Sequence, residues 1–258
     1  IGGILGSIFV QITLVMGIVV VNKGLKIRES WLKRDGLIML LSVLILTFFL
    51  LTDHTLERWE SVILISLYIV YISWLLTNRK EIQLEEEELE GDVAVRGSNW
   101  SVAAYFIMVV CGLAFAVFAA HHLVEQARLI AIELNVPHAI VGTTVSGIGT
   151  SLPELTIAMM AAKRSQGVAI GTLIGSNITD PLLSIGLAGL VHPLPITDAG
   201  FEQIVYIIIP FTILGCFVAL LMMRTSYEFK KWEGYTLIGM YLLFLIALTA
   251  YNRSWIAF

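Results

Sequence analysis

Two acidic side chains stand beside hydroxyl groups inside stretches of sequence that are otherwise apolar. Residues 149–155 read Gly-Thr-Ser-Leu-Pro-Glu-Leu, and Asp180 follows Glu154 by 26 positions, at the end of a Gly-Ser-Asn-Ile-Thr-Asp segment. An ionisable side chain at membrane depth costs about 2.5–3.5 kcal/mol on insertion scales, which makes it a candidate for function. Two such acids among hydroxyl and amide groups indicate a site for a hard cation that crosses a membrane.

Helical spacing places these polar groups on shared faces. Thr150 and Ser151 precede Glu154 by four and three residues, and Ser176 precedes Asp180 by four. Calcium takes about six to eight oxygen ligands at roughly 2.3–2.6 Å, and carboxylates, hydroxyls, amides and free carbonyls all suit it. Sodium uses the same ligand types. The two segments contain no Cys or His, which argues against zinc or copper.

Pro153 predicts an interruption of the helix that carries Glu154. Its ring crowds the carbonyl of Gly149, and it has no N–H to donate to that carbonyl. We therefore expect the helix to kink or open there, with Gly147 and Gly149 easing the opening. A carbonyl freed at membrane depth needs a partner, and a cation can be that partner.

Some of these residues also have a purely structural interpretation. The pairs Gly2/Gly6 and Gly171/Gly175 have the G-x-x-x-G spacing that lets helices pack closely, and packing is the favoured interpretation for them. Serine and threonine hydroxyls in membrane helices often bond to their own helix. The two acids are the least easily explained as structural.

The composition places the chain in the membrane class. It is 57% hydrophobic and 14% charged, with a mean hydropathy of +0.86. The net charge of −4 argues against a nucleic-acid partner, and the expected surroundings are a lipid bilayer. Both cysteines, Cys111 and Cys216, lie in apolar runs, so we expect buried thiols and no disulfide framework.

Eight segments are candidates to cross the membrane as helices, which predicts an all-α polytopic fold. They cover residues 1–22, 36–52, 60–77, 101–120, 138–162, 167–191, 203–223 and 234–251.

The distribution of Lys and Arg predicts the orientation. Alternate connections carry 13 of them and the opposite side carries only three. By the positive-inside rule the first group is cytoplasmic, which puts Phe258 outside. Residues 78–100 form a connection on the cytoplasmic side, in which residues 81–92 hold seven acids. We interpret this segment as a solvated linker, and a calcium-sensing role is the alternative.

The two halves of the chain repeat each other. Residues 1–7 align with residues 170–176, Gln11 aligns with Asp180, and Gly17 aligns with Gly186. The charge argument gives the aligned segments opposite directions, which defines an inverted repeat of the kind found in secondary transporters. We divide the chain into residues 1–77 (three helices of the first repeat), the linker 78–100, and residues 101–258 (five helices of the second repeat). Because the first repeat has three helices and the second has five, we expect that two helices of the first repeat are absent upstream.

The motif Gly-Thr-Ser-x-Pro-Glu followed by Gly-Ser-Asn-Ile-x-Asp resembles the second α-repeat of the calcium/cation antiporter superfamily, which includes the sodium/calcium exchangers. The second α-repeat would cover residues 140–190 or so. The resemblance implies a five-plus-five inverted exchanger fold, of which this chain holds eight helices, and a central cation site shared by both repeats. The residues that match its ion-ligand positions are Glu154, Asp180, Thr150, Ser151 and Ser176 in the second repeat, with a backbone carbonyl near Gly147, and Ser7 and Gln11 in the first.

Three positions depart from the pattern of that superfamily. Gln11 replaces a common asparagine, Ile8 replaces a polar or small residue, and Thr172 replaces a frequent asparagine. These changes bear on which cations the site prefers. The Gly-Asn-x-x-Glu motif of proton-coupled members does not occur, which favours sodium as the driving ion.

The resemblance and the two acids together predict a secondary antiporter of the cell membrane that exchanges Ca2+ for Na+ and needs no organic cofactor. Exchange of another cation pair (magnesium, potassium-coupled or proton-coupled) stays open, and so does a non-transporting membrane scaffold. A channel would need a continuous polar lining. A hydrolase would need a Ser/Lys, Ser/His or His-metal arrangement at depth, which the sequence lacks, so we do not expect an enzyme.

Overall fold

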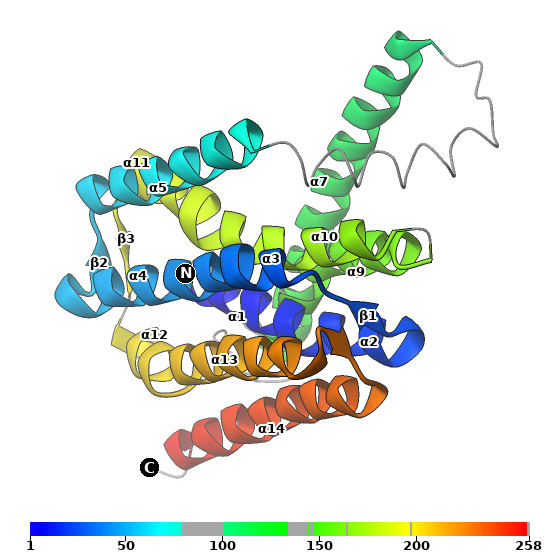
Figure 1. Cartoon of the computed structure of the whole chain (residues 1–258). Coiled ribbons are helices and arrows are strands. Elements are labelled where there is room, and N and C mark those ends of the chain that lie inside the picture. Colours follow the sequence, from blue (N-terminus) through cyan, green and yellow to red (C-terminus); the bar gives the residue numbers. More distant parts are fainter. Residues whose placement is uncertain (79–100, 134–143, 145–146, 164, 197, 257–258) are drawn as a thin grey trace.

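The computed structural model describes residues 1–78, 101–133, 144, 147–163, 165–196 and 198–256, and nearly all of them are helical. Figure 1 shows a bundle of long helices with one helix, α7, standing away from it. The elements of the first half are α1 (Gly2–Val10), η1 (Gln11–Val15), α2 (Met16–Lys23), β1 (Leu25–Lys26), α3 (Glu29–Trp31), η2 (Leu32–Gly36), α4 (Leu37–Asp53), β2 (Thr55–Leu56) and α5 (Arg58–Thr77). Those of the second half are α7 (Val102–Glu133), α9 (Gly147–Ala161), α10 (Gln166–Thr179), η4 (Asp180–Ser184), α11 (Ile185–Val191), β3 (Leu194–Pro195), α12 (Asp198–Gln203), η5 (Ile204–Ile208), α13 (Ile209–Ser226), β4 (Glu228–Phe229) and α14 (Lys231–Ile256).

Six helices of the described residues are long and apolar enough to cross a membrane, which confirms six of the expected spans. They cover Gly2–Lys23, Glu29–Thr52, Arg58–Thr77, Gln166–Val191, Phe201–Thr225 and Lys231–Tyr251. The helix expected over 101–120 is present in α7 but runs on to Glu133, with its apolar part at Val102–Gly112. Of the span expected over 138–162 the structure describes mainly α9, and residues 134–143, 145 and 146 lie outside the described residues, as does the linker from residue 79 onward.

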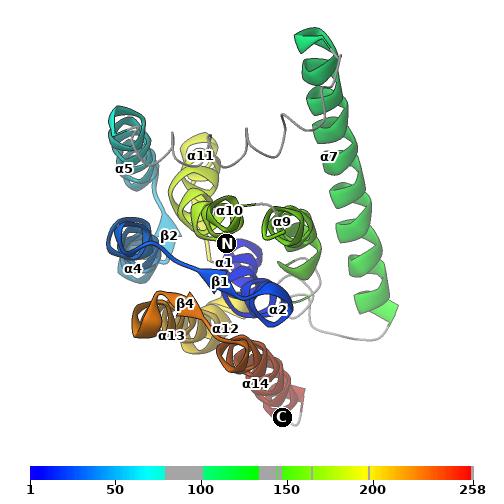
Figure 2. The same ribbon diagram turned by 45° about the vertical axis from the view of Figure 1, so that its right-hand side comes forward.

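The helix formed by α1, η1 and α2 is the centre of the bundle. Its most apolar stretch is 78% buried, against 17% for Arg58–Thr77 and 28% for Lys231–Tyr251. Figure 2, which looks along several helices, shows this helix between α9, α10 and α13, with α5 and α14 at the periphery. Groups that a membrane protein must shield from lipid are therefore expected on α1, η1, α9 and α10.

Two short antiparallel ribbons join the halves at opposite ends of the bundle (Figure 1). At one end β1 pairs with β4, with Leu25 opposite Phe229, and at the other β2 pairs with β3, with Leu56 opposite Leu194. Since β1 aligns with β3 and β2 with β4 in the sequence repeat, each ribbon is the counterpart of the other. The exchange of partners between halves is the geometry of an inverted repeat.

π-helical turns recur at matching positions of the two halves. The segment η1 begins at Gln11 and η4 at Asp180, and η2 and η5 occupy matching positions before α4 and α13. Such turns are rare and are frequent at functional sites. Their recurrence at two candidate ligands indicates that the repeat preserves a local distortion of the backbone as well as a residue pattern.

Glycines allow a close helix crossing between α2 and α14. A Cβ atom at Gly234 would lie 2.9 Å from the carbonyl oxygen of Gly17, and a Cβ at Gly17 would lie 2.9 Å from the carbonyl oxygen of Gly234. Because the obstacles are backbone atoms of the partner helix, the two helices would have to separate.

We expect Gly234→Ala to lower the free energy of unfolding by about 1–3 kcal/mol, the usual cost of overpacking a filled interior. The matched control is Gly239→Ala on the same helix, where a Cβ meets no described atom within 4 Å. The control should be neutral or slightly stabilising because alanine favours helix. Thermal unfolding in detergent measures both, and equal midpoints for the two variants would contradict the proposed crossing.

Candidate cation site

The structure brings together all eight residues that the sequence singles out, from the helices α1, η1, α9, α10 and η4. Ser7 of α1 is the hub of a hydrogen-bonded cluster. Its hydroxyl lies 3.1 Å from the hydroxyl of Ser151 and accepts from the hydroxyl of Thr150 and the side-chain amide of Gln11, each at 3.3 Å. Residues more than 140 positions apart in the sequence therefore share one polar cluster, in which Ser7, Gln11 and Ser151 are buried.

Gln11 connects this cluster to the other acidic segment. Its amide oxygen accepts a hydrogen bond of 2.8 Å from the hydroxyl of Ser176, and its side chain lies close enough to Asp180 to interact with it. The Asp180 carboxylate additionally accepts from the Ser184 hydroxyl at 3.5 Å. Gln11 and Asp180 are aligned residues of the two halves. The first half therefore supplies an amide to this cluster where the second half supplies a carboxylate.

The two carboxylates have no basic partner within the described ranges. Glu154 and Asp180 are close enough to interact electrostatically, and no Lys, Arg or His nitrogen of the described residues lies within 4 Å of either. One Glu154 carboxylate oxygen is shielded from solvent and hydrogen bonds to no described group. Since a buried charge without a partner is costly, this oxygen is suited to a cation.

Backbone oxygens add to the donor set. The hydroxyls of Ser151 and Thr150 lie 2.7 and 3.3 Å from the carbonyl oxygen of Gly147. Gly147 also sets how closely α9 approaches α1, because a Cβ there would lie 3.3 Å from the backbone of Gly6 and Ser7. A larger side chain would push Ser151 away from Ser7.

The chemistry of the site is that of oxygen ligands. Hydroxyls, one amide, carbonyl oxygens and two carboxylates fit calcium or sodium. In the described part of the chain no group of three or more His, Cys, Asp and Glu side chains could hold a metal ion. A softer transition metal would prefer the nitrogen and sulfur ligands of His and Cys.

The opening that the sequence allows at Pro153 does not occur, because α9 continues as a helix through it to Ala161. The distortion lies instead in η1 and η4, where a one-residue expansion of the turn begins at Gln11 and at Asp180. Pro181 was a signal for the second of these turns, whereas η1 contains no proline or glycine and gave none.

The described residues show no close helix contact at Gly171 and Gly175. A Cβ at either residue would meet no atom within 4 Å in the part of the chain that the structure describes, so these glycines do not serve a close helix contact there.

Asn177, beside the predicted face, is fully buried and donates to the carbonyl of Leu173 at 2.6 Å, while its amide oxygen hydrogen bonds to no described group.

Comparisons with known proteins agree with the geometry. The sodium/calcium exchanger protein family matches residues 1–77 and 104–250. A sodium/calcium exchanger of Methanosarcina acetivorans, MaX1, is 30% identical to this chain, with 96% of the chain and 79% of that protein aligned. The inner membrane protein YrbG of Escherichia coli is 25% identical, with 96% of the chain and 76% of that protein covered.

A solved structure has the same fold. It is that of the sodium-calcium exchanger NCX_Mj soaked with Na+ and Ca2+, and it superposes with a TM-score of 0.67 at 24% identity. The match covers 94% of this chain and 74% of that one. The inverted-repeat exchanger architecture expected from the sequence is thereby confirmed. The chain is an integral membrane protein that belongs to the sodium/calcium exchanger family, whose members are transporters rather than enzymes.

Proposed function

We propose that this chain exchanges Ca2+ for Na+ across a membrane, and that both ions compete for the cluster formed by Glu154, Asp180 and the hydroxyls around Ser7. The observation that carries the proposal is the pair of interacting carboxylates on α9 and η4, one of which has a buried oxygen without a hydrogen-bond partner among the described residues. The exchanger relatives and the oxygen-rich donor set support the same function.

The charge of the site explains why exchange is favoured over one-way flow. Two carboxylates nearly neutralise one divalent cation, and several sodium ions give a similar balance. An empty site would expose two negative charges to the hydrophobic zone of the membrane, at a cost of several kcal/mol. The protein should therefore switch readily between its inward-facing and outward-facing states with ions bound, and slowly without them.

The orientation is part of the proposal. We place the side that carries most of the Lys and Arg residues in the cytoplasm, together with the acidic linker, and the carboxyl-terminal end of α14 outside. The relevant membrane is the cell membrane. On this assignment the ribbon of β1 and β4 is cytoplasmic and the ribbon of β2 and β3 is external.

Flux into sealed vesicles tests the exchange. Vesicles that contain the purified protein and are loaded with Na+ should take up radiolabelled Ca2+ when diluted into Na+-free medium, and uptake should stop when the Na+ gradient is removed. Empty vesicles are the control. Uptake that ignores an opposing Na+ gradient would contradict the exchanger.

The same vesicles decide between ion pairs. Gln11 stands where the aligned residue of the other half is an acid, so the site has one carboxylate from η4 and an amide from η1. This lower charge suits monovalent as well as divalent ions. Gradients of K+, Mg2+ or H+ in place of Na+ are therefore measured in parallel, and the ion that drives the fastest Ca2+ uptake is the physiological counter-ion.

A further inference from the structure

The Ser7 hydroxyl is surrounded by hydrogen-bond donors. The amide nitrogen of Gln11 donates to the Ser7 oxygen at 3.3 Å, and Thr150 divides its single proton between Ser7 and the Gly147 carbonyl. Ser151 gives its own proton to the Gly147 carbonyl at 2.7 Å, so Ser7 is the donor in the 3.1 Å contact between the two serines. Since a hydroxyl has one proton and two lone pairs, the hydrogen bonds of Ser7 are already used within the protein.

Gln11 holds this arrangement in place from both ends of its amide group. The nitrogen donates to Ser7, which lies one turn earlier on the same helix, and the oxygen accepts from Ser176 of α10 at 2.8 Å. The side chains of Ser7 and Gln11 are 6% and 1% exposed, so the hydrogen bond between them is shielded from water. An N–H group directed at an oxygen also keeps a cation away from that oxygen, because both approach it with positive charge.

The aligned acid of the second half cannot repeat this contact. Asp180 follows Ser176 by four positions, as Gln11 follows Ser7. An ionised carboxylate, however, accepts hydrogen bonds and has no proton to donate. Asp180 therefore adds a negative charge without covering the oxygen of its serine, whereas Gln11 covers the oxygen of its serine and adds no charge.

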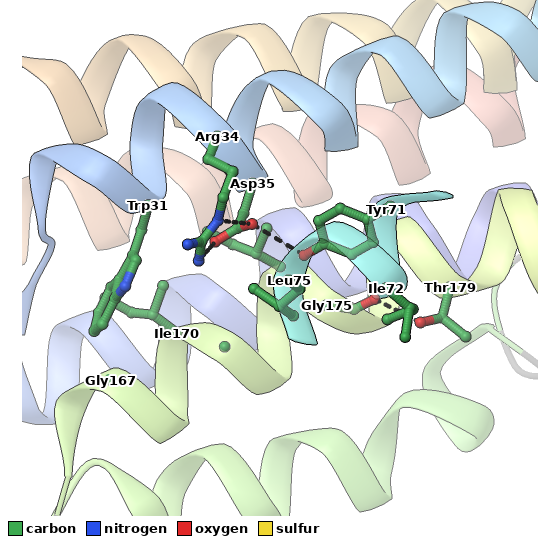
Figure 3. A pocket seen from close by; sticks show the side chains of 12 residues that line it. Trp31, Arg34, Asp35, Tyr71, Ile72, Leu75, Gly167, Ile170, Gly175 and Thr179 are labelled. Atoms are coloured by element: carbon green, nitrogen blue, oxygen red, sulfur yellow. Dashed lines mark hydrogen bonds and ion pairs between the residues drawn. The ribbon is translucent and has the colours of Figure 1, made fainter. Parts of the chain in front are cut away.

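Asp35 shows how a carboxylate of this bundle is compensated without a mobile ion. The Arg34 guanidinium donates to both Asp35 oxygens at 2.6 Å, and the Tyr71 hydroxyl donates to one of them at 3.0 Å (Figure 3). The Asp35 side chain is only 14% exposed, and a fixed positive charge balances it. Within the described ranges no salt bridge involves Glu154 or Asp180, so these two carboxylates are the groups that attract a transported cation.

We infer that Gln11 determines which oxygens hold the transported cation, an inference that rests on the proposed exchange function. By donating to Ser7, Gln11 keeps this hydroxyl out of the coordination shell, and the ion is held towards Glu154 and Asp180. An amide in place of a second acid also lowers the preference for Ca2+ over Na+, because the Coulomb energy scales with the charge of the ion. Gln11 is thus a specificity-determining residue of the exchanger.

Ca2+ binding to the purified protein tests this role without any need for transport. Equilibrium dialysis with radiolabelled Ca2+ gives the Ca2+ affinity, and competition by Na+ gives the Na+ affinity. Gln11→Glu keeps the length of the side chain but replaces the donor with a charged acceptor. It should raise the Ca2+ affinity by at least about tenfold, and the Na+ affinity by about the square root of the same factor.

Gln166→Glu is the matched control for the added charge. It makes the same substitution at the start of α10, where the new carboxylate can still accept from the backbone N–H of Lys26, a contact of 2.9 Å in the wild type. Because Gln166 lies at an exposed end of its helix, water and salt screen the charge, and both affinities should stay within about twofold of wild type.

Gln11→Met separates the covering of Ser7 from direct coordination by Gln11. Methionine has a similar length but cannot donate a hydrogen bond and accepts only weakly. If the Gln11 amide were itself a ligand, the Ca2+ affinity would fall by about tenfold or more. If Gln11 covers Ser7, the substitution frees the Ser7 oxygen, and the Ca2+ affinity should equal or exceed that of wild type.

A double-mutant cycle with Ser7→Ala completes the test. Ser7→Ala should change the Ca2+ affinity by less than about threefold in the wild type, where Ser7 is not a ligand, and by about tenfold in Gln11→Glu, where its oxygen is free. Thermal unfolding of each variant, measured in parallel, confirms that folded protein is compared. Gln11→Met carries the test if the added charge of Gln11→Glu unfolds the ion-free protein.

The outcomes distinguish this role of Gln11 from the exchange function. Unchanged Ca2+ affinity in Gln11→Glu, or a loss of about tenfold in Gln11→Met, would overturn the role of Gln11. The exchange function would stand in either case, provided that wild type binds Ca2+ and Na+ in competition. A wild-type protein that binds no Ca2+ would overturn both.

Discussion

Glu154→Gln is expected to reduce Ca2+ transport by at least about a thousandfold while leaving the protein folded. A unit negative charge at about 4 Å attracts a singly charged cation by on the order of 4 kcal/mol at an effective dielectric constant near 20, and Ca2+ by about twice that. Since each 1.4 kcal/mol is about a factor of ten, a thousandfold loss is the smallest expected for Ca2+. The measurement is radiolabelled Ca2+ uptake into Na+-loaded vesicles, normalised to the amount of inserted protein.

The unfolding temperature of Glu154→Gln distinguishes a role in ion binding from a purely structural role. Glu154 has a carboxylate oxygen that is buried and hydrogen bonds to no described group, so its removal should raise the unfolding temperature of the ion-free protein. Wild type should gain stability when Ca2+ is added, because a ligand that binds only the folded state stabilises it, and the variant should not.

The matched control is Thr156→Val on the same helix. Thr156 is exposed and its hydroxyl donates only to the carbonyl of Leu152, at 2.9 Å, so transport should be close to wild type. Wild-type flux in Glu154→Gln, or equal losses in both variants, would remove Glu154 from the proposed site.

Asp180→Asn is expected to weaken the binding of Ca2+ much more than the binding of Na+. Asparagine keeps an oxygen that can accept from the Ser184 hydroxyl, so the hydrogen bond within η4 survives. The lost charge acts on Ca2+ twice as strongly as on Na+, because the Coulomb energy scales with the charge of the ion. The Ca2+ affinity should therefore fall by roughly the square of the factor by which the Na+ affinity falls.

Two isotope experiments compare these losses in the same vesicles. Na+-driven Ca2+ uptake should disappear in Asp180→Asn, while exchange of labelled for unlabelled Na+ should persist at a reduced rate. Ser184→Ala, which removes only the 3.5 Å hydrogen bond to Asp180, should have a small effect on both. Equal losses of Ca2+ and Na+ exchange in Asp180→Asn would argue that Asp180 acts through structure instead of through its charge.

The residues of the cluster were predictable because a carboxylate is costly to place in a membrane and therefore stands out in an apolar stretch of sequence. A carboxylate such as Glu154 or Asp180 is rare in an apolar stretch, and the alignment of the two halves added Ser7 and Gln11 to the set. The inverted arrangement of helices followed from the repeat and from the unequal distribution of Lys and Arg.

The detailed backbone was harder to predict, because it depends on packing between helices distant in sequence. Pro153 removes one hydrogen bond, yet contacts with α1 and α10 hold α9 helical through it. Nothing in the residues of η1 indicates a wide turn at Gln11. Gly171 and Gly175 have the spacing of a helix contact, yet no described atom lies within 4 Å of a Cβ placed at either.

The two-residue ribbons have a consequence for how the molecule is assembled. Each half contributes one strand to each ribbon, and a pair of strands this short has no stability of its own. Neither half can form either ribbon alone, so both ribbons require the two halves to be docked against each other. The ribbon of β1 and β4 can therefore form only after the chain has been synthesised beyond α13.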